Sequence, residues 1–198
     1  MKHSTFPVNI LPYDGEAFYF ESLIKTEAAN AYLKTLVANA CWKQDEFIMF
    51  GKRIVTSRKV AWYGDEGLPY TYSKTTRYAL PWSKEILEIK NIIENTCARS
   101  FNSCLLNMYH NGSEGMGWHS DNEKELGDRP FIASLSLGAA RRFVFRHKST
   151  GEKSEILLSN GSLLLMNGDT QSHWVHSLPK STKVKDVRVN LTYRNIVL

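Results

Sequence analysis

The sequence predicts an α+β protein that is mainly β, in which helices flank an antiparallel barrel or jelly roll. Two observations support this fold class. Residues 26–38 and 83–97 repeat apolar side chains at the spacing of an amphipathic helix. After Phe101 the chain changes to short β-prone segments that are separated by turn residues. No repeat, low-complexity tract or linker divides the 198 residues, so we expect a single domain over residues 1–198.

Both helices are expected in the first half of the chain. Thr26 is a possible N-cap of the first helix, and Ser83 is the expected N-cap of the second. Residues 39–80, which include the segment between the helices, are expected to mix strand and loop. The apolar positions that share a helix face are Leu33, Leu36 and Val37 in the first helix and Ile86, Ile89, Ile93 and Cys97 in the second.

Six strands are expected after the helices. They are short and closely spaced, which is typical of antiparallel sheets. Residues 149–152 have the composition of a hairpin turn between two of them. The predicted strands cover 103–109, 131–137, 142–146, 154–158, 161–166 and 187–196.

Composition excludes several classes of protein. Hydrophobic residues make up 42% and aromatic residues 12%, which indicates a globular chain and not a disordered one. Because no apolar run is long enough to span a membrane and the N-terminus lacks the pattern of a signal peptide, we expect a cytoplasmic protein, or a nuclear one in a eukaryote. Cys41, Cys97 and Cys104 lack the spacing of a metal site or disulfide framework, so we expect them to be buried and inert.

The formal net charge of +5 favours a polyanionic partner without establishing one. A solvated surface explains any single group of basic residues equally well. Several distant groups can also form one face that follows a phosphate backbone. The three groups are Lys52, Arg53, Arg58 and Lys59; Arg141, Arg142, Arg146, His147 and Lys148; and Lys180, Lys183 and Lys185.

A histidine and an aspartate are candidate metal ligands. His119 and Asp121 are two residues apart, so in an extended segment both side chains point to the same side. A third ligand from a distant strand would complete the two-histidine, one-carboxylate set of iron(II) oxygenases. His173 and His176 are the candidates, and composition alone does not choose between them. Ordinary surface or core positions explain an isolated histidine pair more simply.

The C-terminal strand alternates strictly between polar and apolar residues. Its polar face is either the solvent side of a half-exposed strand or the wall of a pocket. Arg188 and Arg194 suit the second interpretation, because arginine recognises carboxylates with a planar pair of donors. Asn107 and Tyr109 share a face of another strand. Together these residues can line a pocket for 2-oxoglutarate. The polar face consists of Arg188, Asn190, Thr192 and Arg194.

The order of these residues resembles the AlkB family of nucleic-acid demethylases. The resemblance extends from about Phe47 to the C-terminus and is most specific in 106–121, 133–148 and 161–194. Residues 50–52, 63–65 and 142–148 are similar to the branch of the family that repairs duplex DNA. The resemblance implies a double-stranded β-helix, that is, a jelly roll. Within the single domain it divides the chain into an N-terminal helical support (1–45), a nucleotide-recognition region (46–80) and a catalytic core (101–198).

The resemblance also assigns roles to residues of the site. The positions that match the iron ligands are His119, Asp121 and His176, whereas His173 matches a residue that does not bind the metal. Arg188 and Tyr109 are expected to bind the distal carboxylate of 2-oxoglutarate. Arg194 and Asn107 are expected near the carboxylate that chelates the iron. The remaining positions of the cosubstrate pocket are Asn190 and Thr192.

The implied activity is that of an iron(II)- and 2-oxoglutarate-dependent dioxygenase, with O2 as the oxidant. Such an enzyme converts 2-oxoglutarate to succinate and removes the methyl group of 1-methyladenine or 3-methylcytosine as formaldehyde. These damaged bases pair poorly, so flipping them out of a helix costs little. The implied partner is alkylated DNA, with duplex DNA favoured, and neither a membrane nor an obligate protein partner is implied.

Six further positions match the substrate contacts of the family. Tyr72 and His119 are expected to sandwich the damaged base, and Tyr70 and Glu123 to contact its edge. Strand packing is the alternative explanation for the two tyrosines, and a solvated loop for the glutamate. The segment that matches a finger inserted into the base stack consists of Met49, Phe50 and Gly51.

The finger segment has alternatives of its own. A buried strand would explain its apolar residues equally well. This chain has Arg53 where the duplex-repair branch has an aromatic residue, which leaves the shape of the finger open. Two other functions remain possible: the same chemistry on RNA or on a protein side chain, or a jelly-roll module that binds metal without catalysis. A simple metal binder would not need two arginines on one strand.

Overall fold

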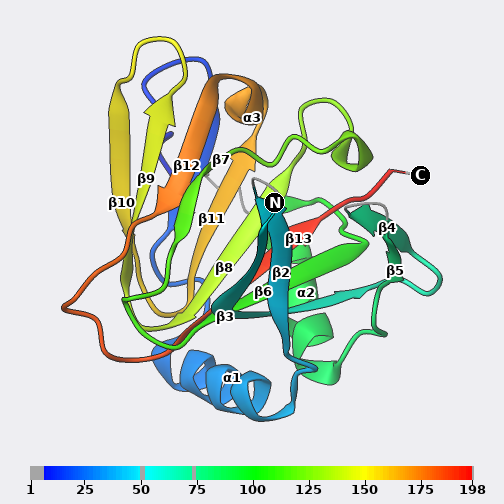
Figure 1. The fold of residues 1–198 in the computed structure, drawn as a ribbon. Helices are drawn as coiled ribbons and strands as arrows, with labels where there is room; N and C mark the ends of the chain where they lie inside the picture. Colours follow the sequence, from blue (N-terminus) through cyan, green and yellow to red (C-terminus); the bar gives the residue numbers. More distant parts are fainter. Residues whose placement is uncertain (1–6, 50–51, 73–74, 198) are drawn as a thin grey trace.

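The computed structural model describes the backbone of residues 7–49, 52–72 and 75–197 (Figure 1). It leaves out the side chains of 45–49, 52–54, 70–72 and 75–77. Two antiparallel sheets form the body of the molecule, and the two long helices lie side by side along one end of the view in Figure 1. The fold class predicted from the sequence, mainly β with flanking helices, is confirmed.

The larger sheet contains seven strands in the order β1-β11-β8-β13-β6-β3-β2. Its central strand, β13, pairs with β8 on one side and β6 on the other, so all of its backbone groups have partners available. The bounds of the strands are β1 Glu16–Phe20, β2 Lys43–Met49, β3 Lys52–Gly64, β6 Ser103–Tyr109, β8 Ile132–Gly138, β11 Ser162–Asn167 and β13 Arg188–Arg194.

The smaller sheet contains four strands in the order β10-β9-β12-β7. The expected hairpin at 149–152 joins β9 to β10, and its prediction is confirmed. A separate two-stranded sheet pairs β4 with β5. The bounds are β7 Met116–His119, β9 Arg141–His147, β10 Lys153–Leu158, β12 Trp174–Leu178, β4 Pro69–Tyr72 and β5 Thr75–Tyr78.

Helices α1 (Thr26–Asn39) and α2 (Lys84–Cys97) pack on the outer face of the larger sheet. The cap of α2 is the predicted one, because the Ser83 hydroxyl accepts a hydrogen bond from the Ile86 N–H. The prediction that Thr26 caps α1 is wrong: Thr26 is the first helical residue, and the extended Lys25 precedes it without a side-chain cap. The apolar residues that fill this layer include Leu36, Ile86, Ile89, Ile93, Leu106, Leu135, Val189, Leu191 and Tyr193.

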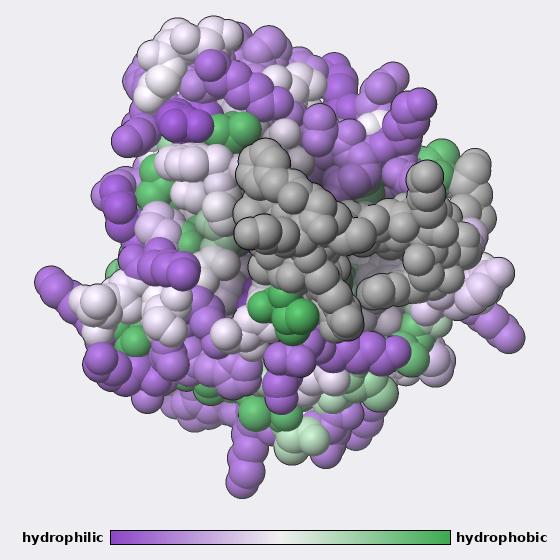
Figure 2. All heavy atoms as spheres, viewed as in Figure 1, coloured by the Kyte–Doolittle hydropathy of each residue, from purple (hydrophilic) through white to green (hydrophobic). Residues whose placement is uncertain are grey.

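A second apolar cluster lies between the two sheets. It joins Ile132, Leu164 and Met166 of the larger sheet to Phe145 and Trp174 of the smaller one. The outer surface in Figure 2 is mostly hydrophilic, with apolar residues in small separate groups. Among the described residues, no helix combines the length and the apolar character that crossing a membrane requires.

Several elements differ from the sequence prediction. Strands β1, β7 and β12 were not predicted; β7 and β12 are short and interrupt their apolar residues with histidine, glycine or serine. The aromatic run in β1 is a strand signal that could have identified it. The expectation that all cysteines are buried is wrong for Cys41, which is exposed just after α1. Val37 is also exposed, because the buried face of α1 is centred on Ala29 and Leu36.

Candidate metal and cosubstrate site

A cavity of about 1160 Å³ opens between the two sheets. Its lining combines polar side chains from the central strand of the larger sheet with histidines from the smaller one. Every candidate iron and 2-oxoglutarate residue named from the sequence lies on its wall. These residues are His119, Asp121, His176, Asn107, Tyr109, Arg188, Asn190, Thr192 and Arg194.

The three candidate metal ligands converge at one end of the cavity. His119 is the last residue of β7 and lies opposite His176 in the register of β12. The Nε2 atoms of the two histidines are 3.1 Å apart, and His119 Nε2 is 3.9 Å from Asp121 Oδ1. The ligand atoms of all three residues lie within 4.8 Å of one another, which suits a single ion.

Neighbouring groups hold these ligands in place. The Nδ1 atom of His119 lies 2.9 Å from the Gly117 carbonyl, and donation of its proton there leaves the Nε2 lone pair for a metal. The buried amide of Gln171, in helix α3 (Thr170–His173), accepts the backbone N–H of Asp121 at 2.9 Å. Gln171 therefore joins the Asp121 loop to the segment that leads into His176. The sequence analysis did not identify this residue.

The electrostatics of the site suit a cation. Burial lowers the pKa of His176 from 6.5 to about 3, so its imidazole is neutral at pH 7 and needs to release no proton on metal binding. Burial by itself would raise the pKa of Asp121, but Arg194, whose Nη2 is 2.9 Å from Asp121 Oδ2, and the two histidines lower it. The carboxylate is thus ionised and available as a ligand.

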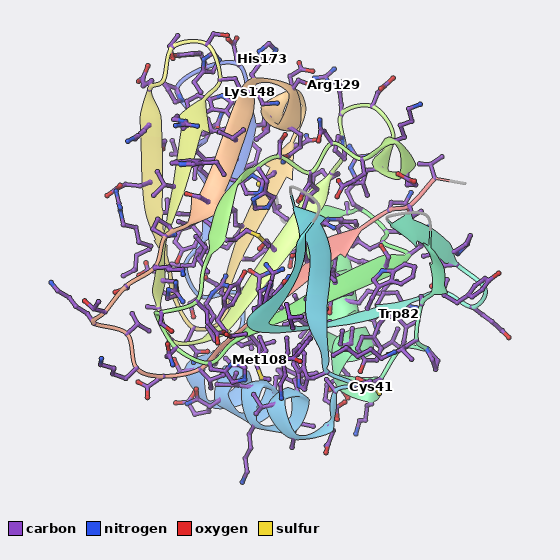
Figure 3. All side chains as sticks on the ribbon, viewed as in Figure 1. Cys41, Trp82, Met108, Arg129, Lys148 and His173 are labelled. Atoms are coloured by element: carbon purple, nitrogen blue, oxygen red, sulfur yellow. The ribbon has the colours of Figure 1, made fainter. Side chains whose placement is uncertain are left out.

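His173 belongs to a different group of residues. It ends α3, beside Lys148 in Figure 3, and its ring stacks on that of His147 at 6.1 Å. With Asp14, the two histidines form a second cluster of possible ligands. The N–H of Thr150, however, donates to His147 Nδ1 at 3.1 Å, so the proton of a neutral ring is on the Nε2 atom that faces Asp14. We interpret this second cluster as structural.

The polar face of β13 lines the cavity from Arg188 to Arg194, and Arg194 reaches the candidate metal ligand Asp121. Arg188 is 2% exposed, and its Nη2 donates to Ser136 Oγ at 2.9 Å and to Asn190 Oδ1 at 2.6 Å. Asn190 in turn donates to Thr192 Oγ1 at 2.8 Å and accepts from Ser134. The half-exposed interpretation of β13 is therefore wrong, since Arg188, Asn190 and Thr192 are buried and Arg194 is only partly exposed. The two β8 serines were missed because no local pattern reveals that β8 pairs with β13.

The buried polar atoms around the cavity include two on candidate cosubstrate residues that have no hydrogen-bond partner among the described residues. They are Arg188 Nε and Asn107 Oδ1, and both belong to residues that line the cavity. Leaving such atoms unpaired is costly, so their presence beside a cavity indicates a polar ligand. A guanidinium donor and a tyrosine hydroxyl both suit a carboxylate, and the Tyr109 ring lies against Arg188. The residues present therefore fit 2-oxoglutarate, as the three converging ligands fit iron(II).

The predicted substrate contacts are only partly described. Glu123 lines the cavity, and its buried Oε2 has no hydrogen-bond partner among the described residues. Phe50 and Gly51 lie outside the described residues. Met49, Tyr70 and Tyr72 have a described backbone, in β2 and β4, but their side chains lie outside the description.

Some members of the basic groups do not lie on the surface. Arg58, Arg141 and His147 are buried, so each of the first two groups contains members that face the interior. Arg142 pairs with Glu155 on the outside of the smaller sheet. The guanidinium of Arg146 lies 4.5 Å from the centre of the exposed Trp118 ring.

Comparison with known proteins places the chain among oxygenases. The model of the 2OG-Fe(II) oxygenase superfamily matches residues 16–194. Human "DNA oxidative demethylase ALKBH2" is 44% identical over 158 residues, which are 76% of this chain and 60% of that protein. Human "Alpha-ketoglutarate-dependent dioxygenase alkB homolog 3" is 38% identical over 187 residues, 89% of this chain and 65% of that protein.

Two further comparisons cover nearly the whole chain. "DNA oxidative demethylase ALKBH2" of Arabidopsis thaliana is 30% identical over 216 residues, 94% of this chain and 68% of that protein. The structure of OsALKBH1 has a TM-score of 0.65 with 16% identity and covers 93% of this chain and 99% of that chain, which shows a shared fold. The chain spans 60 to 65% of the length of the human relatives.

Proposed function

This chain belongs to the AlkB family of the 2OG-Fe(II) oxygenase superfamily, and we propose that it is an oxidative demethylase of N-alkylated bases in DNA. The resemblance inferred from the sequence is thereby confirmed as family membership. The family fixes the cofactors as iron(II), 2-oxoglutarate and O2. The demethylation itself, its substrates and its partners are part of the proposal.

The main support for the proposal is that candidate metal ligands and candidate cosubstrate residues line one cavity. His119, Asp121 and His176 would hold the iron at one end. Arg188 and Tyr109 would bind the distal carboxylate of 2-oxoglutarate at the other. When bound, the metal with O2 and 2-oxoglutarate supplies the oxidation of an N-methyl group, which leaves as formaldehyde.

The chain's own residues supply position and charge. The guanidinium of Arg188, fixed by Ser136 and Asn190, presents its remaining donors to a carboxylate. Arg194 pairs with Asp121 and so connects the metal end of the cavity to the cosubstrate strand. Asn190 and Thr192 complete a lining that keeps the cosubstrate between these ends.

Two features support an alkylated base as the substrate. The two ALKBH2 relatives are named DNA oxidative demethylases. The carboxylate of Glu123 lines the cavity, and among the described residues one of its oxygens has no partner, whereas 1-methyladenine and 3-methylcytosine carry positive charge. We assign Glu123 and Tyr70 to the edge of the base, and Tyr72 and His119 to its faces.

Duplex DNA is the finer part of the proposal. It rests on the likeness of the Met49, Phe50 and Gly51 segment to the finger of the duplex-repair branch. Strands β2 and β3 pair antiparallel up to Met49 and Lys52, the described residues on either side of Phe50 and Gly51 in the sequence. The net charge of +5 suits such a partner. This substrate also implies that the protein acts in the compartment that holds the DNA.

The proposal is tested by incubating a duplex that carries one 1-methyladenine with the protein, iron(II), 2-oxoglutarate and ascorbate. Mass spectrometry should show the loss of one methyl group, with succinate and formaldehyde released only when O2 and 2-oxoglutarate are both present. Parallel reactions on single-stranded DNA, RNA and a methylated peptide compare the substrate classes. Turnover of RNA or peptide with no turnover of DNA would overturn the proposal, and succinate release from none of them would indicate a non-catalytic module.

A further inference from the structure

The position of Arg141 is not explained by the roles assigned so far. It is the first residue of β9 and is 1% exposed, although the sequence analysis grouped it with surface residues. Among the residues that the structure describes, it forms no ion pair with a carboxylate. Burying a guanidinium carries a large desolvation cost, which hydrogen bonds to its N–H groups can offset.

Three backbone carbonyls satisfy this guanidinium. Arg141 Nη2 donates to Glu114 O at 2.7 Å and to Pro179 O at 2.9 Å, and Nη1 donates to Asn111 O at 3.3 Å. The first and third of these carbonyls belong to the loop between β6 and β7. Pro179 lies in the connection from β12 to β13. One side chain therefore joins two connections, and each runs between a candidate metal strand and a candidate cosubstrate strand.

The same guanidinium lies against Tyr109. Its carbon is 5.8 Å from the centre of the tyrosine ring, and the corresponding carbon of Arg188 is 5.5 Å from it. Tyr109 is 4% exposed and lines the cavity, whereas Arg141 does not reach the cavity wall. Contact of the ring with two guanidiniums restricts its orientation.

Charge at this end of the cavity is positive. The pKa of Arg188 is lowered to about 10, chiefly by burial; Tyr109 acts to raise it and the positive charge of Arg141 acts to lower it. The described hydrogen bonds of Arg188 go to neutral oxygens of Ser136 and Asn190. A carboxylate that binds here would be the counter-ion of both arginines.

We propose that Arg141 is a positioning residue for 2-oxoglutarate, which holds the Tyr109 ring and both loops at the end of the cavity where the distal carboxylate binds. The inference rests on the proposed function of the cavity, because it takes 2-oxoglutarate as the ligand. Arg141 acts through Tyr109 and through the field it adds to that of Arg188. It is distinct from the residues that contact the cosubstrate directly.

The test measures 2-oxoglutarate binding to the manganese(II)-loaded protein by calorimetry, in wild type, Arg141→Met and Arg141→Lys. The dissociation constant should rise about tenfold or more in the methionine variant and about threefold or more in the lysine variant, which keeps the charge but loses the planar fork. Manganese(II) affinity without 2-oxoglutarate should stay near the wild-type value. Arg142→Met is the matched control, since Arg142 is adjacent but faces outward to Glu155.

A double-mutant cycle with Tyr109→Phe separates positioning from general loosening. If Arg141 acts through the tyrosine, its replacement should cost much less affinity in the Tyr109→Phe background. Wild-type binding within twofold in a folded Arg141→Lys or Arg141→Met protein would overturn the inference, as would equal losses of manganese(II) and 2-oxoglutarate affinity. If the methionine variant does not fold, the 2-oxoglutarate affinity of the lysine variant decides whether the inference holds. Absence of 2-oxoglutarate binding in the wild type itself would instead overturn the proposed function.

Discussion

His173 and His176 differ in their neighbours and not in their chemistry. The spacing of the two residues did not show which of them is the metal ligand. Only the resemblance to a family favoured His176. The structure gives a physical reason for the same choice. His176 lies opposite His119 across the β7–β12 pair, whereas His173 ends the preceding helix and stacks on His147.

This difference gives a prediction for the two histidines. Under anaerobic conditions, iron(II) and 2-oxoglutarate should produce a weak visible charge-transfer band in the wild type. Replacing His119, Asp121 or His176 with alanine should abolish the band, because each change removes one of three ligands. Absorption spectra of the folded variants check this result. His173→Ala is the control, and a lost band in that variant with a retained band in His176→Ala would reverse the assignment.

Arg188 illustrates how a single residue combines charge and shape. Its Nη2 is already committed to Ser136 and Asn190, so the guanidinium is held in one plane with other donors left for a ligand. Arg188→Lys keeps the charge but cannot make this set of contacts. We expect the apparent KM for 2-oxoglutarate to rise about tenfold or more, which corresponds to about 1.4 kcal/mol or more of lost binding.

The measurement is steady-state succinate release at varied 2-oxoglutarate, together with iron(II) affinity from a separate titration. Iron affinity should be unchanged, since Arg188 is not one of the three candidate metal ligands. Arg142→Lys on the outer face of β9 provides a control for the exchange itself. A variant that loses iron affinity but keeps a normal KM would contradict the role of Arg188.

At the scale of the element, strand β13 has one face in the cavity and the other in the apolar core. Its polar residues line the cavity, while Val189, Leu191 and Tyr193 pack into the core beneath the helices. The period of two in the sequence predicted this division, because successive side chains of a strand face opposite ways. It did not predict Ser134 and Ser136, since strand pairing joins segments far apart in the chain and has no local signal.

A second prediction at this scale concerns the segment between β2 and β3. If Phe50, which follows β2 in the sequence, fills the gap left by a flipped base, Phe50→Ala should remove about 1–3 kcal/mol of stacking, or roughly a 5- to 150-fold loss of turnover efficiency on duplex DNA. The loss on a single strand should be small, because no gap needs filling. Turnover on matched single- and double-stranded oligonucleotides measures the two effects.

A melting curve for each variant separates this role from packing. A core position for Phe50 predicts a lower melting temperature and equal losses on both substrates. That outcome would remove the main support for duplex DNA while leaving the demethylase proposal intact. Val55→Ala, a change at an exposed residue of β3, is a suitable control because it should affect neither substrate.

At the scale of the whole molecule, the sequence predicted the residues that line the cavity better than the residues that hold them in position. The residues assigned to ligand binding form short patterns with fixed spacing, such as His119 with Asp121. Residues that contact these segments from elsewhere in the chain, such as Gln171 and Arg141, have no such pattern. Their roles depend on which strands become neighbours, and the sequence predicts strands more readily than their order.

Burial of the metal site also couples it to the stability of the whole molecule. The pKa of His176 falls from 6.5 to about 3 on folding, so below pH 6.5 the unfolded chain binds a proton that the folded chain does not. In the metal-free protein, this contribution is complete above pH 6.5 and is lost as the pH falls toward 3. At about 1.4 kcal/mol per pH unit, the loss between pH 7.5 and pH 5 is roughly 2 kcal/mol.

Chelator-treated protein should therefore lose more stability between these two pH values than His176→Gln, which cannot titrate at this position. Urea denaturation of both proteins at each pH measures the difference, expected to be about 2 kcal/mol. His173→Gln removes an exposed imidazole and should retain the wild-type dependence. Asp121, whose pKa is lowered, would act in the same direction but only at lower pH, because its contribution is lost below its ordinary range. Identical pH dependence in wild type and His176→Gln would show that burial of this imidazole does not control the acid stability of the metal-free protein.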